Sequence, residues 1–194
     1  MAARARNELR IIGGEWRGRR LRFADGAGLR PTADRNRETL FNWLQAVVPG
    51  SHCLDLFAGS GALGFEAASR GAASVLLAER NRNAIARLRQ NIGLLQAEAR
   101  IHVHAGDALS LLRQPPDRPV DIVFLDPPFT GGLLEPACQA LSAGDWLHAD
   151  SRVYLEHARQ SPPQLPPGWK ILRERTAGDV CFLLVAPEGR QITA

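Results

Sequence analysis

One stretch of the sequence decides the fold: Leu54-Asp55-Leu56-Phe57-Ala58-Gly59-Ser60-Gly61-Ala62-Leu63-Gly64. An apolar run with strand character leads into a Gly-rich turn, and a helical pattern follows the turn. Three glycines, at positions 59, 61 and 64, match the pattern G-x-G-x-x-G. Glu79 follows the first of them by twenty positions, at the end of the next strand. This arrangement predicts an open α/β sheet with a cofactor at the carboxyl ends of its strands.

Strand and helix patterns alternate around this turn. After the first strand, at 53–57, further strands are predicted at 74–78, 101–104, 120–125 and 153–155, and helices at 31–47, from the turn to 69, and at 81–94, 108–112 and 133–141. Two last strands, at 170–175 and 180–185, predict a hairpin at the sheet edge. Repeated βα units predict a mostly parallel sheet covered by helices on both faces.

The N-terminal part of the chain is strongly basic. We expect residues 1–30 to form a hairpin extension, with strands at 9–12 and 19–23, in front of one globular unit spanning 31–194. Residues 1–37 hold ten Arg against four acids, a balance of +6, whereas the rest of the chain has a balance of −2. This asymmetry indicates a polyanionic partner, although a solvated basic arm gives the same pattern.

Composition excludes several classes of protein. The 194 residues are 45% hydrophobic and 23% charged, which fits one globular domain and not a disordered chain. No apolar run reaches the roughly 18 residues of a membrane span, and no apolar segment follows the basic N-terminus, so we expect a cytoplasmic protein. Cys53, Cys138 and Cys181 are too widely spaced for a zinc pattern. We expect reduced thiols and no metal.

Asp55 helps to choose the cofactor. Its carboxylate lies near the end of the first predicted strand, where a dinucleotide would place its anionic pyrophosphate. A carboxylate there repels NAD, whereas it attracts the sulfonium and ammonium groups of S-adenosylmethionine (SAM). Glu79 suits the ribose hydroxyls of either ligand. Asp107, after the third strand, could accept a hydrogen bond from an adenine amino group or simply cap a helix.

The tetrapeptide Asp126-Pro127-Pro128-Phe129 follows the apolar strand at 120–125. An exocyclic amine of a nucleic-acid base is a poor nucleophile, because its lone pair is delocalised into the ring. Asp126 and the Pro127 carbonyl can accept its two N–H groups, and the carboxylate stabilises the positive charge that develops on nitrogen. Phe129 can stack on a base that is flipped out or single-stranded. The tetrapeptide therefore predicts methyl transfer to a base amino group.

The chain resembles the bacterial small-subunit ribosomal RNA guanine-N2 methyltransferases (the RsmD family) from Arg10 to about Val185. The segments that carry the resemblance are Arg10-Ile11-Ile12-Gly13-Gly14, Trp16-Arg17-Gly18-Arg19, Leu29-Arg30-Pro31-Thr32, Asp34-Arg35, Arg37-Glu38-Thr39-Leu40-Phe41-Asn42-Trp43-Leu44, Leu54–Gly64 and Phe124–Phe129. It implies a Rossmann-like class I SAM-dependent methyltransferase with a seven-stranded sheet and a small N-terminal hairpin. It also implies a guanine N2 of 16S ribosomal RNA, in the small subunit or its assembly intermediate, as acceptor, and a segment at 37–42 that helps to cover the cofactor.

These arguments define two sets of candidate residues besides the tetrapeptide. The cofactor set comprises Asp55, Phe57, Ala58, Gly59, Ser60, Gly61, Glu79, Arg80, Asp107 and Ala108, with Thr39 from the covering segment. The RNA-backbone set comprises Arg10, Arg17, Arg19, Arg20, Arg22, Arg30, Arg35 and Arg37. Binding through the second set should weaken with salt.

Four alternatives fit part of the same pattern. A DNA adenine-N6 or cytosine-N4 methyltransferase would use the same tetrapeptide, but the short chain has no separate target-recognition domain. A protein glutamine methyltransferase usually has Asn in place of Asp126. An NAD-dependent oxidoreductase fits the glycines and is disfavoured by Asp55. A non-catalytic RNA-binding module would lose nothing on substitution of Asp126.

Overall fold

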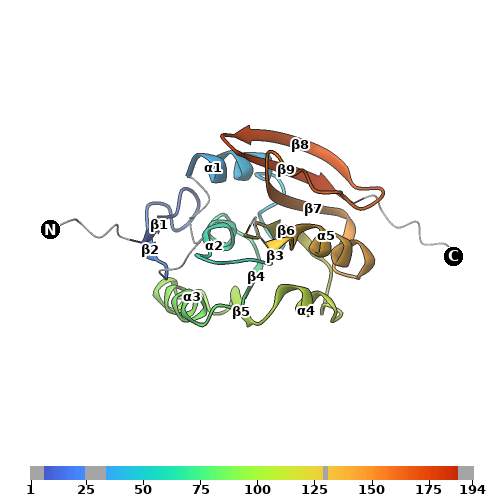
Figure 1. Cartoon of the computed structure of the whole chain (residues 1–194). Helices are drawn as coiled ribbons and strands as arrows, with labels where there is room; N and C mark the ends of the chain where they lie inside the picture. Colours follow the sequence, from blue (N-terminus) through green and yellow to red (C-terminus); the bar gives the residue numbers. More distant parts are fainter. Residues whose placement is uncertain (1–6, 25–33, 129–130, 188–194) are drawn as a thin grey trace.

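The computed structural model describes residues 7–24, 34–128 and 131–187 (Figure 1). Its elements, in chain order, are β1 Glu8–Arg10, β2 Arg20–Arg22, α1 Asp34–Trp43, β3 His52–Asp55, α2 Ala62–Ser69, β4 Ser74–Glu79, α3 Arg82–Leu95, β5 Ile101–Ala105, α4 Ala108–Leu112, β6 Val120–Leu125, α5 Leu134–Ala143, β7 Leu147–Ala158, β8 Lys170–Ala177 and β9 Val180–Ala186. None of the helices described there is long and apolar enough to cross a membrane.

Seven strands form one sheet in the order β5-β4-β3-β6-β7-β9-β8. The first five of these strands run parallel, and β9 and β8 are antiparallel to their neighbours. This confirms the predicted sheet with its C-terminal hairpin. The carboxyl ends of β3, β4, β5 and β6 therefore lie along one edge, which is where open α/β sheets bind ligands.

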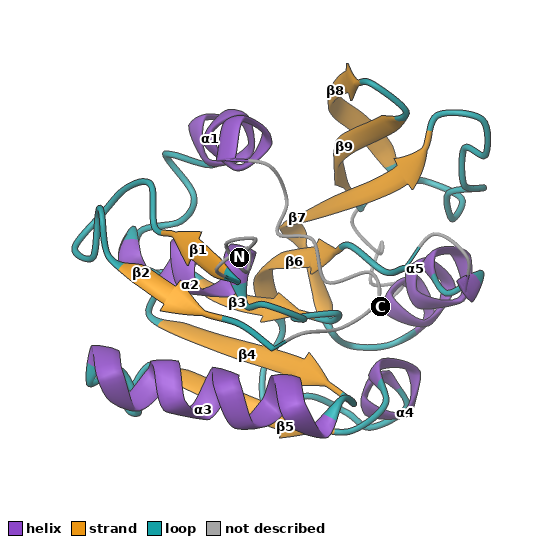
Figure 2. Ribbon diagram, turned by 60° about the vertical axis from the view of Figure 1, so that its left-hand side comes forward, coloured by secondary structure: helices purple, strands orange, loops and turns teal. Residues whose placement is uncertain are grey.

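Helices cover both faces of the sheet (Figure 2). One core cluster joins α1, α2 and α3 to strand residues such as Cys53 and Phe124. The other joins α4 and α5 to the alternate strand residues, such as Leu54 and Leu125. Because successive side chains of a strand point to opposite faces, strands that are buried on both faces are apolar throughout. The three cysteines are buried and free.

The N-terminal hairpin of β1 and β2 forms its own antiparallel pair beside the main sheet. Leu9, Ile11, Trp16 and Leu21 are buried and belong to the same core cluster as α1, α2 and α3. The guanidinium of Arg100 lies 4.8 Å from the centre of the Trp16 ring. The hairpin is thus packed into the main core, and Trp16 serves that packing.

Most predicted boundaries lie within two residues of those observed, but two elements differ. α1 ends at Trp43 and not at 47, because the Val47 amide bonds the carbonyl of Leu44, three residues back, as in a tight turn. The predicted start of that helix lies outside the described residues. β7 begins at Leu147 but was predicted only from 153, because the polar residues of its first part do not give the apolar pattern of a buried strand. One of them, Ser151, is buried and donates a hydrogen bond to the Val120 carbonyl at 2.7 Å.

Candidate active site

The Gly-rich turn connects β3 to α2 in a conformation that suits glycine. Gly59 has a φ of 51° and Gly61 a φ of 79°. A Cβ at Gly61 would collide with the Phe65 ring. The turn is closed by a hydrogen bond of 2.6 Å from the Gly61 amide to the Ala58 carbonyl. It brings the amino end of α2, whose first backbone N–H groups have no carbonyl partner within the helix, to the end of β3.

Carboxylates gather at the ends of the central strands. Asp55 ends β3 and is 2% exposed, and its Oδ2 accepts a hydrogen bond of 3.2 Å from the Gly64 amide. Burial raises the pKa of Asp55 to about 7, and the negative charges of Asp126 and Glu79 add to that rise. The three side chains therefore act on one another electrostatically. Such a cluster favours a cationic ligand over an anionic one.

Glu79 holds the turn in place. Its Oε2 accepts the Gly59 amide at 2.8 Å, and its Oε1 accepts the amides of Arg80 at 2.9 Å and Asn81 at 2.7 Å. Each carboxylate oxygen has two lone pairs, so Oε2 retains the capacity to accept a ligand hydroxyl as well. Glu79 thus links the glycine turn to the end of β4, which the sequence pattern alone did not reveal.

Except for Thr39, the remaining members of the cofactor set lie at the same strand ends or in the turn between β3 and α2. Asp107 caps α4, because its Oδ1 accepts the Ser110 amide at 2.9 Å, and that bond lowers the pKa of Asp107. Its predicted contact with adenine stays a prediction. Ala58, Ser60, Gly61 and Ala108 are buried, Phe57 and Gly59 are half-buried, and Arg80 is exposed. Thr39 lies on α1, where its hydroxyl donates to the Arg35 carbonyl and accepts from Arg175.

The tetrapeptide leaves the sheet at the end of β6. Asp126 is half-buried, Pro127 is buried and Pro128 is exposed, whereas Phe129 lies outside the described residues. A pocket of about 200 Å³ adjoins the two prolines and is also lined by Glu156 and His157 at the end of β7. Glu156 accepts a hydrogen bond of 2.6 Å from the Tyr154 hydroxyl, and burial followed by the Glu156 charge raises the pKa of Tyr154.

Most of the arginines predicted to contact RNA are exposed. This group comprises Arg10, Arg17, Arg19, Arg20, Arg22 and Arg35, and Arg30 lies outside the described residues. The prediction that Arg37 contacts RNA is wrong, because its side chain is fully buried and has no surface for RNA. Its Nη2 donates to the Arg10 carbonyl at 2.8 Å and to Asp34 at 2.6 Å, whereas Nε and Nη1 have no hydrogen-bond partner among the described residues. Arg37 joins α1 to the hairpin.

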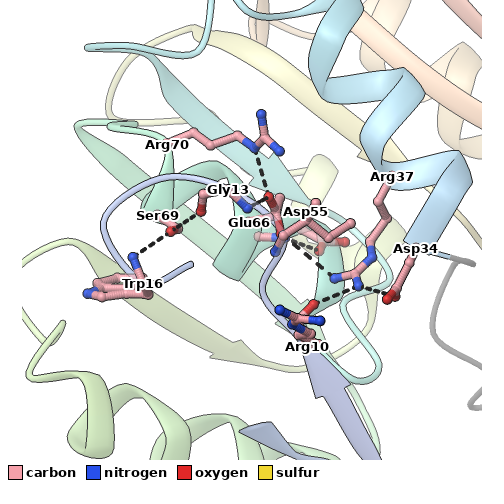
Figure 3. A network of polar contacts seen from close by, with 11 residues as sticks. Arg10, Gly13, Trp16, Asp34, Arg37, Asp55, Glu66, Ser69 and Arg70 are labelled. Carbon is pink, nitrogen blue, oxygen red and sulfur yellow. Dashed lines mark hydrogen bonds and ion pairs between the residues drawn. The ribbon is translucent and has the colours of Figure 1, made fainter. Parts of the chain in front are cut away.

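Glu66 of α2 is the centre of the contact between hairpin and sheet (Figure 3). The carboxylate is fully buried and accepts the backbone amides of Ile12 and Gly13, both at 2.8 Å. It also pairs with Arg70 at 2.7 Å and lies 3.9 Å from Nη1 of Arg37. One acid therefore binds two guanidinium groups and the backbone of the N-terminal hairpin. The sequence analysis missed it, although a lone acid in an apolar helix is itself a signal of a buried partner.

Ser69, one helical turn beyond Glu66, completes this contact. Its hydroxyl accepts the Trp16 amide at 2.9 Å and donates to the Gly13 carbonyl at 2.6 Å, as Figure 3 shows. Gly14 has a φ of 76°, and a Cβ there would collide with the Ser69 carbonyl. Since α2 begins at the Gly-rich turn, the same eight-residue helix carries that turn at one end and binds the arginine hairpin at the other.

Fold and site together define a class of protein. A seven-stranded sheet in this order, with a Gly-rich turn after β3 and an acidic strand edge, is the fold of class I methyltransferases. A solved structure with this fold is a putative methyltransferase from Escherichia coli, with a TM-score of 0.86 and 42% identity over 94% of this chain and 99% of that one.

The chain belongs to the family described as Conserved hypothetical protein 95, whose model matches residues 9–186. Curated relatives include the Ribosomal RNA small subunit methyltransferase D of Escherichia coli strain K12, 45% identical over 184 residues, which are 94% of this chain and 92% of the relative. The protein of that name from Haemophilus influenzae is 43% identical over 182 residues, 93% of this chain and 94% of the relative. The RsmD-like resemblance is thereby confirmed.

Proposed function

We propose that this protein transfers a methyl group from SAM to the exocyclic N2 amino group of a guanine in small-subunit ribosomal RNA. The observation that carries the proposal is the acidic strand edge, where Asp55 lies close enough to Asp126 and Glu79 for their charges to raise its pKa. The names of the relatives support ribosomal RNA as the substrate. Guanine N2 follows from the family resemblance.

The residues at the strand edge fit SAM. Asp55 and the amino end of α2 would hold the amino-acid part, and Glu79 would accept the ribose hydroxyls. The glycines of the turn allow the ligand to approach the backbone closely. Bound SAM supplies a methyl group on a positively charged sulfur. A dinucleotide fits poorly, because its pyrophosphate would meet the buried Asp55.

Asp126 and Pro127 would position the acceptor amine. The Asp126 carboxylate accepts one N–H of the amino group and the Pro127 carbonyl accepts the other, which favours a pyramidal nitrogen whose lone pair can attack. Asp126 then stabilises the positive charge on nitrogen and takes its proton. The stiffness of two successive prolines keeps both acceptors at fixed positions, because each ring restricts φ.

The test uses labelled SAM with small-subunit particles from cells that lack the enzyme, followed by digestion of the RNA to nucleosides. We expect N2-methylguanosine with the unaltered protein and a loss of rate of about 10²-fold to 10⁴-fold with Asp126→Ala. Asp117→Ala is the matched control. Asp117 is exposed and precedes β6, so it lies where the parallel strands begin, whereas Asp126 lies where they end. Labelled DNA or protein, without labelled RNA, would contradict the substrate; unchanged activity of Asp126→Ala would contradict the mechanism.

A further inference from the structure

The outer strand of the sheet carries a second group of basic side chains, separate in sequence from those of the N-terminal hairpin. β8 is the edge strand, and its first seven residues are all exposed. They include Lys170, Arg173 and Arg175 against a single acid, Glu174. Together with Arg35 on α1, these three residues form what we call the basic edge. None of the three β8 residues was part of the RNA set predicted from sequence.

The register of the sheet places the basic edge level with the active site. Leu125, the last residue of β6, pairs with Leu155 of β7, so Asp126 lies level with Glu156. Glu156 pairs with Phe182 of β9, and Phe182 pairs with Arg175 of β8. Arg175 is therefore three strand spacings from the strand end that bears Asp126, which is roughly 14 Å.

The two β8 arginines project from the face of the sheet that α1 covers, which is also the face of Phe124, two residues before Asp126. Arg173 and Arg175 pair with Leu184 and Phe182, which belong to the core cluster on the α1 side. Nη1 of Arg175 donates to the Thr39 hydroxyl of α1 at 2.7 Å. Figure 1 shows the end of β8 beside α1. Arg35, Arg173 and Arg175 thus border the junction between α1 and the sheet edge.

We infer that the basic edge binds phosphates of the ribosomal RNA strand that carries the target nucleotide. Arginine forms planar, bidentate bonds with phosphate, and such contacts fix the position of a nucleic acid without reading its sequence. An RNA strand held at the basic edge would cross the strand ends and present one base to Asp126. The identity of the nucleic acid rests on the proposed function.

The features of the strand favour RNA over a protein that adds a strand to the sheet. Ile171 is 52% exposed and Leu172 37% exposed, and exposed edge strands can pair with another chain. However, the register shift between Ile171 and Arg173 interrupts a regular edge, and exposed charges are what edge strands use to avoid pairing. The net charge of +2 on Lys170–Ala177 complements phosphate.

The test compares Arg173→Glu/Arg175→Glu with Arg118→Glu as the matched control. Arg118 is an exposed arginine just before β6. It lies at the amino end of that strand, whereas Asp126 follows its carboxyl end. Methyl transfer to small-subunit particles and to protein-free ribosomal RNA is measured over a range of salt. We expect the double variant to raise KM for RNA about tenfold or more, and to make the log–log salt dependence shallower by roughly 1.4 for two lost phosphate contacts. kcat should stay unchanged, because neither arginine belongs to the tetrapeptide or to the strand-end carboxylates.

Three results would overturn the inference while leaving the proposed function intact. One is an unchanged KM in the double variant when the unaltered protein methylates RNA. Another is an equal rise of KM in Arg118→Glu, which would indicate a general charge effect. The third is a rise of KM on particles but not on protein-free RNA, which would assign the basic edge to a ribosomal protein. Failure of the unaltered protein to methylate RNA would instead refute the proposed function.

Discussion

The N-terminal hairpin of β1 and β2 and the C-terminal hairpin of β8 and β9 are held in place by different means. β1 and β2 are strands of three residues, and side chains of α2 bind the backbone that follows β1. β8 and β9 have eight and seven residues and extend the main sheet by backbone pairing. The short hairpin therefore depends on a few buried polar groups, whereas the long one depends on many equivalent backbone bonds.

This difference predicts unequal sensitivity to substitution. A buried charge that loses its partner still has the full free-energy cost of its desolvation, so a single substitution can strongly lower the stability of the fold. A bond between exposed side chains is replaced by water when one partner is removed, so its loss costs little. The N-terminal hairpin should thus be fragile at a few positions, and the C-terminal hairpin tolerant at most of its surface.

The largest effect is expected at Glu66. Glu66→Ala removes one of the two carboxylates beside the buried Arg37, the partner of Arg70 and the acceptor of two backbone amides, and we expect the free energy of unfolding to fall by about 3–5 kcal/mol. Urea denaturation measures this loss. Glu66→Gln keeps the shape and the acceptor oxygen of the side chain, so it should cost less than Glu66→Ala. A loss below about 1 kcal/mol for Glu66→Ala would contradict the account of the hairpin.

A pair of glycine substitutions tests the same contrast in the backbone. Gly14 and Gly178 both have positive φ, at 76° and 62°, but a Cβ at Gly14 would meet the Ser69 carbonyl, whereas a Cβ at Gly178 would meet nothing within 4 Å. We expect Gly14→Ala to cost about 3 kcal/mol and Gly178→Ala about 1 kcal/mol of unfolding free energy. Equal costs in thermal or urea unfolding would show that only φ matters at both sites.

The site between the hairpins should respond to pH through Asp55. Its pKa is raised from 3.8 to about 7, so the stability it contributes is present below its unfolded pKa and is lost as the pH rises through about 7. A cationic ligand favours the ionised form and lowers that pKa. SAM should therefore bind more tightly as the pH rises from 6 to 8, by up to about tenfold.

Calorimetric titration at several pH values measures this dependence. Asp55→Asn should abolish it. Asp107→Asn is the control, because the pKa of Asp107 is lowered by its bond from the Ser110 amide, which keeps its titration below this pH window. An affinity that is flat with pH in the unaltered protein would mean that Asp55 does not bear the cationic part of the ligand.

The contrast between the hairpins also shows what sequence could predict. Elements with a clear apolar pattern, such as β6 and α4, are predicted with their observed boundaries, because the apolar residues that become buried are neighbours in the sequence. The Gly-rich turn and the strand-end position of Asp126 could be predicted because glycines and strand-end acids have fixed offsets along the chain, whereas their roles toward cofactor and substrate stay predictions. The C-terminal hairpin followed from two apolar or alternating runs around a Gly-containing turn.

The contacts that hold the N-terminal hairpin were not predictable in the same way. Glu66 and the Ile12 amide are 54 positions apart, and Ser69 and the Trp16 amide are 53 positions apart, so no local pattern joins them. Arg37 was assigned to RNA because its sequence neighbours are basic. Its burial depends on Asp34, the Arg10 carbonyl and Glu66 meeting in space, and charge counting does not distinguish a buried arginine from an exposed one.

The smallest effect is expected where α1 meets the C-terminal hairpin. Thr39→Val removes the exposed hydroxyl that accepts from Arg175, and water can replace both partners, so the free energy of unfolding should change by no more than about 0.5 kcal/mol. Ser69→Ala is the matched change at the other hairpin, and it should cost about 1–3 kcal/mol because the Trp16 amide is left buried without its acceptor. Equal losses in urea denaturation would contradict the contrast between the two hairpins. A clear fall in SAM affinity with unaltered stability in Thr39→Val would instead place the hydroxyl at the cofactor, as the resemblance implies.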